Sequence, residues 1–235
     1  MKLLSICPTR NRPELLKQML ESYRLTKTVD AEMFVYVSED DPRLNDYREV
    51  FNIFGVKNII AERRSVVKVL NYVSTELYPG IEYYQEVNDD HIYRTRGWDK
   101  AFINKIEQAG KGWGIACGND LMPEPWGIAR HPSAAVISGN IVRTLGCFVL
   151  PAFDILYIDT YLRDIAEGIN ALYRMPEIVI EHFHWLNGRR KKDKNYDAVY
   201  AREMYSKFTP IYFNWAKYQR AQDIKKLKEA RDVRL

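Results

Sequence analysis

The segment YYQEVNDDH, residues 83–91, decides the fold, because an apolar and aromatic run ends there in two carboxylates and an imidazole. A short run of this kind that stops at turn-forming residues is typical of a buried strand. We therefore predict a strand over residues 83–87. Its carboxyl end delivers the tetrapeptide NDDH, residues 88–91, to one edge of a sheet.

Two earlier runs end in the same way. A strand predicted over residues 2–7 leads through PTRNR, residues 8–12, into a helix over residues 13–23. A second strand over residues 31–38 ends in the acidic turn SEDDP, residues 38–42. Ligands of parallel sheets bind beyond the carboxyl ends of the strands. The three loops are therefore expected to meet at one polar site.

Strands and helices continue to alternate along the chain, which predicts a mostly parallel central sheet flanked by helices. Further strands are expected over residues 58–61, 114–117, 134–136 and 178–180, and further helices over residues 66–77, 97–108, 139–145 and 159–172. Strand patterns nearly stop at residue 188, and helices are expected over residues 196–205 and 213–231. We therefore expect an α/β domain of residues 1–187 and a basic helical C-terminal appendage of residues 188–235.

The composition limits the class of protein. Of the 235 residues, 46% are hydrophobic, which is enough for one substantial core, and a net charge of +4 is too small for a surface that binds polyanions everywhere. Three cysteines, none in a CxxC pair, argue against a disulfide framework and for a reducing compartment. We find no signal-peptide pattern and no run of about 20 apolar residues, so a cytoplasmic protein is expected.

The NDDH tetrapeptide is a candidate metal site, because it holds adjacent acids with no Lys or Arg among them. Asp89, Asp90 and His91 supply oxygen and imidazole ligands that suit Mn²⁺ or Mg²⁺, and such an ion can bridge two phosphates of a nucleotide. The alternative for this tetrapeptide is a solvated turn, since Asn and Asp are common turn formers.

A second cluster, EHFH, follows the strand predicted over residues 178–180. Alternation along a strand points His182 and His184 to the same face, so one of them could complete the metal site. The alternative is an ordinary polar or core histidine.

Cationic side chains precede two of the predicted helices. Thr9, Arg10 and Arg12 lie between a strand and a helix, where backbone N–H groups and the helix dipole favour a phosphate. Arg63 and Arg64 offer a similar site before the helix over residues 66–77. Alternatively, the hydroxyl simply caps the helix and the arginines remain solvated.

The acidic turn after the second predicted strand is the third polar element of the site. A carboxylate of Asp40 or Asp41 could accept a hydrogen bond from a base or a ribose, or could only shape the turn.

The order of these motifs resembles the GT-A glycosyltransferases over roughly residues 2–185, particularly the family 2-like enzymes and the compact versions of bacteriophages. The resemblance implies that the first loop, Asp40 and Arg63 hold the nucleotide of a sugar nucleotide, with Pro8, Thr9, Arg10 and Arg12 in that loop. It also implies that NDDH is the DxD element that binds the metal and the sugar diphosphate. The matching pair is either Asn88 and Asp90 or Asp89 and His91.

Two further residues gain a role from the same resemblance. Trp98, in RGWD, would border the sugar or the acceptor, and core packing is the default alternative. Asp159 matches the general base of inverting members, and its alternative is a helix N-cap. The inverting xED motif is replaced by YID, residues 157–159, so inversion and retention both remain open.

The resemblance implies transfer of a sugar from a nucleoside diphosphate sugar, UDP being the commonest nucleotide of the family, to an acceptor hydroxyl. A modified base in phage DNA is one acceptor to consider, since basic residues 189–194 and 217–234 could guide a polymer. One alternative is a nucleotidyltransferase, although residues 5–17 lack its Gly-rich loop. The other is a non-catalytic nucleic-acid-binding module that uses the basic C-terminal region.

Overall fold

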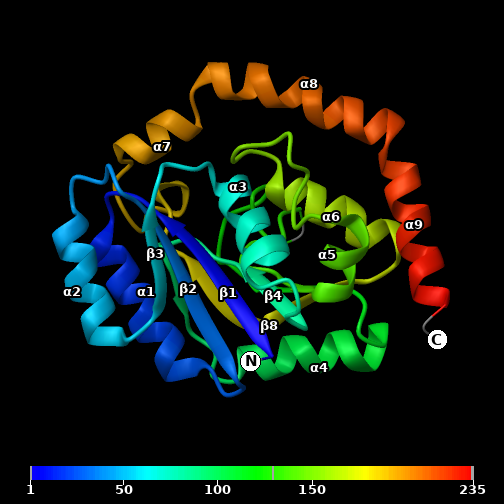
Figure 1. The fold of residues 1–235 in the computed structure, drawn as a ribbon, viewed down its shortest axis with the longest axis horizontal. Helices are drawn as coiled ribbons and strands as arrows, with labels where there is room; N and C mark the ends of the chain where they lie inside the picture. Colours follow the sequence, from blue (N-terminus) through cyan, green and yellow to red (C-terminus); the bar gives the residue numbers. More distant parts are fainter. Residues whose placement is uncertain (1, 129, 234–235) are drawn as a thin grey trace.

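An eight-stranded sheet runs through the computed structural model, which describes residues 2–128 and 130–233. The last two residues of the expected appendage therefore lie outside the described residues. In sheet order the strands are β3 (Lys57–Ala61), β2 (Ala31–Ser38), β1 (Leu3–Thr9), β4 (Tyr83–Glu86), β7 (Val136–Ser138), β6 (Ile115–Asn119), β8 (Leu172–His182) and β5 (His91–Tyr93). Figure 1 shows this sheet at the centre of the molecule.

The half of the sheet that holds the first four strands of the chain is parallel. β1 pairs in parallel with β2 and β4, and β2 pairs in parallel with β3. β7 is antiparallel to β4 and β6, β8 is parallel to β6, and β5 is antiparallel to β8. The carboxyl ends of β1, β2 and β4 therefore meet at one edge, which confirms the expected parallel arrangement.

Helices cover both faces of the sheet. They are α1 (Pro13–Thr26), α2 (Leu44–Phe54), α3 (Val66–Asn71), α4 (Trp98–Gly110), α5 (Gly139–Leu145), α6 (Ile158–Gly168), α7 (Lys194–Val199), α8 (Arg202–Tyr218) and α9 (Arg220–Asp232), with one π-helical segment at Tyr72–Leu77 and a short 3₁₀ turn at Trp185–Asn187. α1 begins at Pro13, whose fixed φ suits a first helical position, and buries Leu16, Met19 and Leu20 at helical spacing. α2 was not expected from the sequence.

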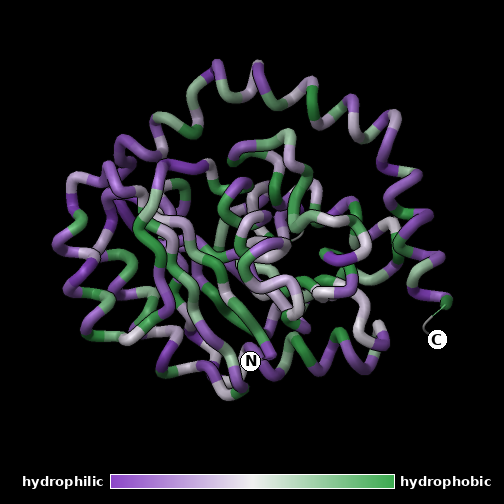
Figure 2. Tube along the Cα trace, viewed as in Figure 1, coloured by the Kyte–Doolittle hydropathy of each residue, from purple (hydrophilic) through white to green (hydrophobic). Residues whose placement is uncertain are grey.

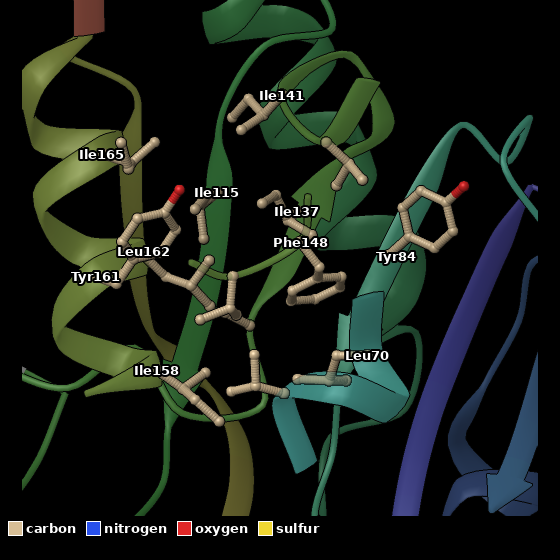
Figure 3. Packing of buried hydrophobic residues seen from close by; sticks show 14 of the residues in the cluster. Leu70, Tyr84, Ile115, Ile137, Ile141, Phe148, Ile158, Tyr161, Leu162 and Ile165 are labelled. Carbon is tan, nitrogen blue, oxygen red and sulfur yellow. The ribbon is translucent and has the colours of Figure 1, made fainter. Parts of the chain in front are cut away.

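The core lies in two apolar clusters, one on each face of the sheet. Side chains of α3, α5 and α6 pack into the cluster on one face, here called the first cluster. Side chains of α1, α2 and α4 pack into the cluster on the other face, the second cluster. Figure 3 shows part of the first cluster, in which Leu70, Phe148 and Tyr161 converge on the strand residues Ile115 and Ile137. Figure 2 shows hydrophobic residues concentrated in the central strands and hydrophilic residues on the outer turns of the helices.

The C-terminal helices belong to the first cluster. Phe208 and Trp215 of α8 and Leu227 of α9 are buried in it, and α9 contacts α5 and α6. Figure 1 shows α8 arching over the molecule and α9 descending along its side. Within the described residues, no helix is both long and apolar enough to span a membrane.

The expected boundary between the helix of residues 159–172 and the strand of residues 178–180 is wrong. α6 ends at Gly168, the chain turns through Asn170 at a φ of 54°, and β8 already begins at Leu172. Pro176 lies inside this strand, between the paired residues Met175 and Val179, where the register to β6 shifts. A proline is tolerated at such an irregularity because its missing N–H breaks no ladder bond there.

Candidate functional site

A cavity of about 840 Å³ opens at the carboxyl ends of β1, β2 and β4. Pro8 and Thr9 line it from the end of β1, Arg10 and Arg12 from the loop that follows, and Asn88, Asp89 and Asp90 from the loop after β4. The start of α6 and the segment from α7 to α8 close it from the other side. The cavity therefore lies where the strand-end loops were expected to converge.

Hydrogen bonds join the first two loops. Arg10 donates to both oxygens of Asp40, at 2.6 Å and 3.2 Å. The backbone N–H of Asn11 donates to Oδ2 of the buried Asp41 at 2.8 Å, and the N–H of Arg43 donates to its Oδ1 at 2.8 Å. Asp41 therefore holds the turn together. Asp40 is exposed and does not line the cavity, but it accepts a hydrogen bond from Arg10, which does.

Asp89 is buried against the first loop. Its Oδ2 accepts a hydrogen bond from Thr9 Oγ1 at 2.6 Å, and its Oδ1 accepts one from Arg12 Nη1 at 3.1 Å. Burial raises the pKa of Asp89 to about 6, although the charge of Arg12 opposes the shift. Both oxygens of Asp89 therefore have protein partners.

Asp90 lies deeper and has one oxygen to spare. Its Oδ2 accepts a hydrogen bond from Tyr196 Oη and lies 3.4 Å from Arg12 Nη1 and 3.5 Å from Arg190 Nη1. Its Oδ1 lies 3.2 Å from His182 Nε2, yet makes no directed hydrogen bond within the described residues. Burial alone would raise the pKa of Asp90, but His182 and Arg12 outweigh it and lower the pKa well below its ordinary value.

The acids of NDDH do not lack basic partners, which corrects the premise of the sequence argument. Arg12 and Arg190 come from segments far away in the chain; Arg12 approaches both carboxylates, and Arg190 approaches Asp90. Asp193 joins them, because it accepts hydrogen bonds from Arg12 at 2.8 Å and 2.9 Å and from Arg190. The beginning of the C-terminal region thus lies directly on the NDDH loop.

His91 is not available as a metal ligand, contrary to the sequence prediction. Its Nδ1 accepts a hydrogen bond from the N–H of Asn88 at 2.9 Å, and its Nε2 lies 3.0 Å from Ser133 Oγ. Burial, with the nearby charge of His182, lowers the pKa of His91 to about 3. Its place in β5, opposite His182, fixes the ring for a structural role.

His182 and His184 meet at the cavity, with ring centroids 4.8 Å apart. His184 accepts a hydrogen bond from the N–H of Leu186 at 3.1 Å and lies 3.4 Å from Tyr200 Oη, so both of its nitrogens already have neighbours. Burial would lower the pKa of His182, but Asp90 outweighs it and raises that pKa. Of the histidines predicted as ligands, His182 has the most suitable surroundings.

The fit of a divalent cation rests on Asp90 and His182. No three His, Cys, Asp or Glu side chains of the described residues are grouped to hold a metal ion by themselves. However, Asp90 Oδ1 lacks a directed partner and lies 3.2 Å from His182 Nε2, close to the separation of about 3 Å between adjacent ligands of one small octahedral ion. Mg²⁺ commonly takes only one or two protein ligands and completes its shell with phosphate and water. The two side chains fit a metal site that a nucleotide would complete.

A second group of carboxylates also lines the cavity: Glu86, Asp120 and Asp159. Burial, followed by the charge of Asp159, raises the pKa of Glu86 to about 8. Burial raises the pKa of Asp120 to about 6. Burial also raises the pKa of Asp159, against the opposing charges of His131 and His182. Burial therefore favours the protonated form in this acidic group, most of all at Glu86.

The remaining predicted site residues divide between cavity and core. Arg63 lines the cavity. Asp159 also lines it, and its N-cap alternative is wrong, because Tyr157 holds the cap position of α6. Trp98 does not line the cavity; it is fully buried against Tyr23 and Tyr93, as the core alternative predicts.

Several residues of the site were not found in the sequence. Glu86 could have been suspected, because it is a charged residue at the end of a buried strand. Arg190, Asp193 and Tyr196 gave no signal, since their partners are brought to them only by the tertiary fold.

No protein-family model matches the chain, and no curated protein matches it in sequence. Solved structures do match. TarS 1–349 of S. aureus in complex with UDP-GlcNAc aligns at a TM-score of 0.66 and 13% identity, over 98% of this chain and 71% of that one. In another TarS 1–349 structure the match covers 77% of this chain and 59% of that one, at a TM-score of 0.58 and 11% identity. The chain thus spans about three fifths of TarS 1–349 in that alignment.

Two further structures match. The mannosyltransferase PcManGT from Pyrobaculum calidifontis, in complex with GDP-Man and Mn²⁺, aligns at a TM-score of 0.56 and 14% identity, over 97% of this chain and 73% of that one. A cytidylyltransferase from Leptospira borgpetersenii aligns at 0.50 and 11% identity, over 75% and 76%. At these identities the likeness concerns the fold, and it confirms the expected GT-A-like α/β fold.

Proposed function

We propose that the protein is a glycosyltransferase that moves a sugar from a nucleoside diphosphate sugar to an acceptor hydroxyl. The observation that carries the proposal is one cavity that is lined both by arginines, Arg10, Arg12 and Arg63, and by the carboxylates Glu86, Asp120 and Asp159. Asp90 and His182 line the same cavity, 3.2 Å apart. Such a cavity can neutralise a departing diphosphate with its arginines and accept a proton with a carboxylate.

The part of the cavity that we propose for the nucleotide combines the N-terminal ends of two helices with guanidinium groups. Arg10 and Arg12 precede α1, and Arg63 precedes α3. The N-terminal ends of helices and arginine side chains both favour phosphate oxygens. The known complexes of TarS with UDP and UDP-GlcNAc favour UDP as the nucleotide, and the GDP-Man complex of PcManGT makes GDP the next choice.

Asp90 and His182 would hold Mn²⁺ or Mg²⁺ together with the diphosphate. The ion would supply positive charge to the leaving group. Support comes from the spare oxygen of Asp90 and from Mn²⁺ in the PcManGT structure. Arg190 and Tyr196, which approach Asp90 in the structure, would have to yield part of this space.

Asp159 is the proposed general base. It lies in the first turn of α6 and lines the cavity. Burial raises its pKa, which makes its carboxylate a stronger base. Glu86, whose pKa is raised to about 8 by burial and then by Asp159, would stay protonated at neutral pH and donate a hydrogen bond. This division leaves Asp159 as the group that accepts the proton of the acceptor hydroxyl.

A non-catalytic nucleic-acid-binding module is the weaker reading, because the basic run that would contact a polymer is engaged elsewhere. Arg189 pairs with Glu181 at 3.0 Å, Arg190 pairs with Asp193, and Lys192 pairs with Asp197 at 2.8 Å. These pairs also reduce the case for DNA as acceptor. The cytidylyltransferase match keeps a nucleotidyltransferase as the second candidate.

The test is a calorimetric titration of UDP, GDP and CTP into the protein with Mn²⁺ or with EDTA. The Asp89→Ala/Asp90→Ala double variant is compared with Glu76→Ala, which changes an exposed glutamate outside the cavity. We expect a nucleoside diphosphate to bind in a metal-dependent way to the wild type and the control, and not to the double variant. Tighter binding of CTP than of any diphosphate would favour the nucleotidyltransferase, and no binding of any nucleotide would contradict the proposal.

A further inference from the structure

The wall of the cavity includes an exposed aromatic side chain. Trp126 lines the cavity while 47% of its surface remains open to solvent. Its ring stacks on His131, with centroids 6.1 Å apart and an interplanar angle of 20°. An aromatic ring that is exposed inside a cavity is available to pack against a ligand, and we name Trp126 and His131 the stacking platform.

The loop that carries this platform is held in shape by its own hydrogen bonds. The N–H of Trp126 donates to Pro123 O at 2.8 Å, and the N–H of His131 donates to Gly127 O at 3.0 Å. A side chain at Gly127 would place Cβ only 2.7 Å from Met122 O, so the tight turn requires glycine. Arg174 also donates to Ile128 O at 3.1 Å. The ring of Trp126 is therefore presented by a fixed backbone, which lowers the entropic cost of stacking.

The surroundings of the platform select the chemistry of its ligand. His131 and the proposed base Asp159 line the same cavity as Trp126, together with the carboxylates of Glu86 and Asp120. Carboxylates repel the phosphates of a nucleic acid but accept hydrogen bonds from neutral hydroxyls. An indole ring packs against the C–H face of a pyranose.

We propose that the acceptor is a carbohydrate whose pyranose ring stacks on Trp126 and turns one hydroxyl toward Asp159. This inference rests on the proposed function and specifies its acceptor. In the transfer, the acceptor oxygen forms a bond to the anomeric carbon of the donor sugar, the bond from that carbon to the diphosphate oxygen breaks, and Asp159 takes the hydroxyl proton. The diphosphate keeps the electron pair and leaves with the nucleotide.

The experiment is saturation-transfer NMR on the full chain with millimolar methyl glycosides of glucose, galactose, mannose and N-acetylglucosamine, and with their β-linked disaccharides. Spectra are taken with and without UDP and Mg²⁺. Mg²⁺ is used in place of Mn²⁺ because it is diamagnetic and does not broaden the NMR signals. Trp126→Ala is compared with Trp126→Phe, which keeps a ring, and with Phe213→Ala, which removes an exposed ring that does not line the cavity. Nucleotide binding is measured calorimetrically on the same samples, so that loss of the nucleotide site is seen separately.

We expect at least one glycoside to bind through its C–H face. Its dissociation constant should rise about tenfold in Trp126→Ala, and change little in Trp126→Phe and Phe213→Ala. Nucleotide affinity should be the same in all four proteins. The inference is overturned if no glycoside binds, if binding is equal in Trp126→Ala, or if a single-stranded oligonucleotide binds through Trp126 instead. Failure of nucleotide binding in the wild type would overturn the proposed function itself.

Discussion

Nη1 of Arg12 lies 3.1 Å from Oδ1 of Asp89, and the side chains are only 12% and 6% exposed. This pair links the loop after β1 to the NDDH loop after β4, so the proposed phosphate-binding and metal-binding segments contact each other directly. A charge that is buried and paired becomes costly when its partner is removed.

Arg12→Gln should therefore destabilise the protein by about 3 kcal/mol, because Asp89 then stays buried without its cation. Arg10→Gln, which breaks the exposed pair with Asp40, should cost less than about 1 kcal/mol. Urea denaturation of both variants measures the difference. Adding Asp89→Asn to Arg12→Gln should restore part of the loss, and equal losses for the two single variants would contradict the argument.

The neighbouring acids Asp40 and Asp41 should separate binding from stability. Asp41→Ala removes the acceptor of two backbone N–H groups and should lower the free energy of unfolding by about 2 kcal/mol. Asp40→Ala should change stability by less than about 0.5 kcal/mol but weaken nucleotide binding. Denaturation and nucleotide titration of the two variants check this. A strong loss of stability in Asp40→Ala would show that its role is structural.

Glu86→Gln should stabilise the protein more at pH 8 than at pH 5. Burial, followed by the charge of Asp159, raises the pKa of Glu86 from 4.5 to about 8 in the folded state. Between these values the unfolded chain loses the proton that the folded protein keeps, so the wild type loses stability as pH rises and the glutamine variant does not. One pKa unit is about 1.4 kcal/mol, and because Asp159 shares the shift we expect a gain on the order of 2 kcal/mol at pH 8.

Thermal denaturation at the two pH values measures this gain, with Glu76→Gln as the exposed control. A difference between the glutamine variant and the wild type that does not change with pH would contradict the assignment of the buried proton to Glu86.

Asp159→Asn should abolish transfer while leaving the donor bound. Loss of a general base costs about 10²-fold to 10⁴-fold in rate, whereas the arginines proposed to bind the nucleotide are unchanged in this variant. Asp154→Asn, which lines the same cavity but pairs with Lys207 at 2.8 Å, is the matched control. Release of nucleoside diphosphate from the sugar nucleotide, with and without a glycoside, gives both rates. Equal rates in Asp159→Asn and wild type would remove Asp159 from the mechanism.

The part of the site that the sequence predicted is the part that follows from strand ends. Thr9, Asp40 and Asp89 each come directly after or at the end of a strand in a parallel half-sheet, and topology alone brings such positions to one edge. The GT-A-like fold could be predicted for the same reason, because the alternation of strands and helices is a local pattern.

The rest depended on contacts that no local pattern encodes. Tyr196 reaches Asp90 across 106 residues of sequence, and Asp193 reaches Arg12 across 181. The three residues of β5 are too few to show the alternation of a strand, so the sequence does not predict that His91 lies in one. In the structure both ring nitrogens of His91 have hydrogen-bond partners. Pro176 concealed most of β8, because a proline ordinarily argues against a central strand.

The most direct test of the central claim is an anomalous difference map at the manganese edge from crystals grown with MnCl₂ and UDP-GlcNAc, or with MnCl₂ and GDP-Man. We expect one manganese peak in contact with Asp90 and His182, with the diphosphate of the sugar nucleotide beside it and the nucleoside against Arg12 and Arg63. Nucleotide density outside the cavity, or a manganese peak away from Asp90, would contradict it.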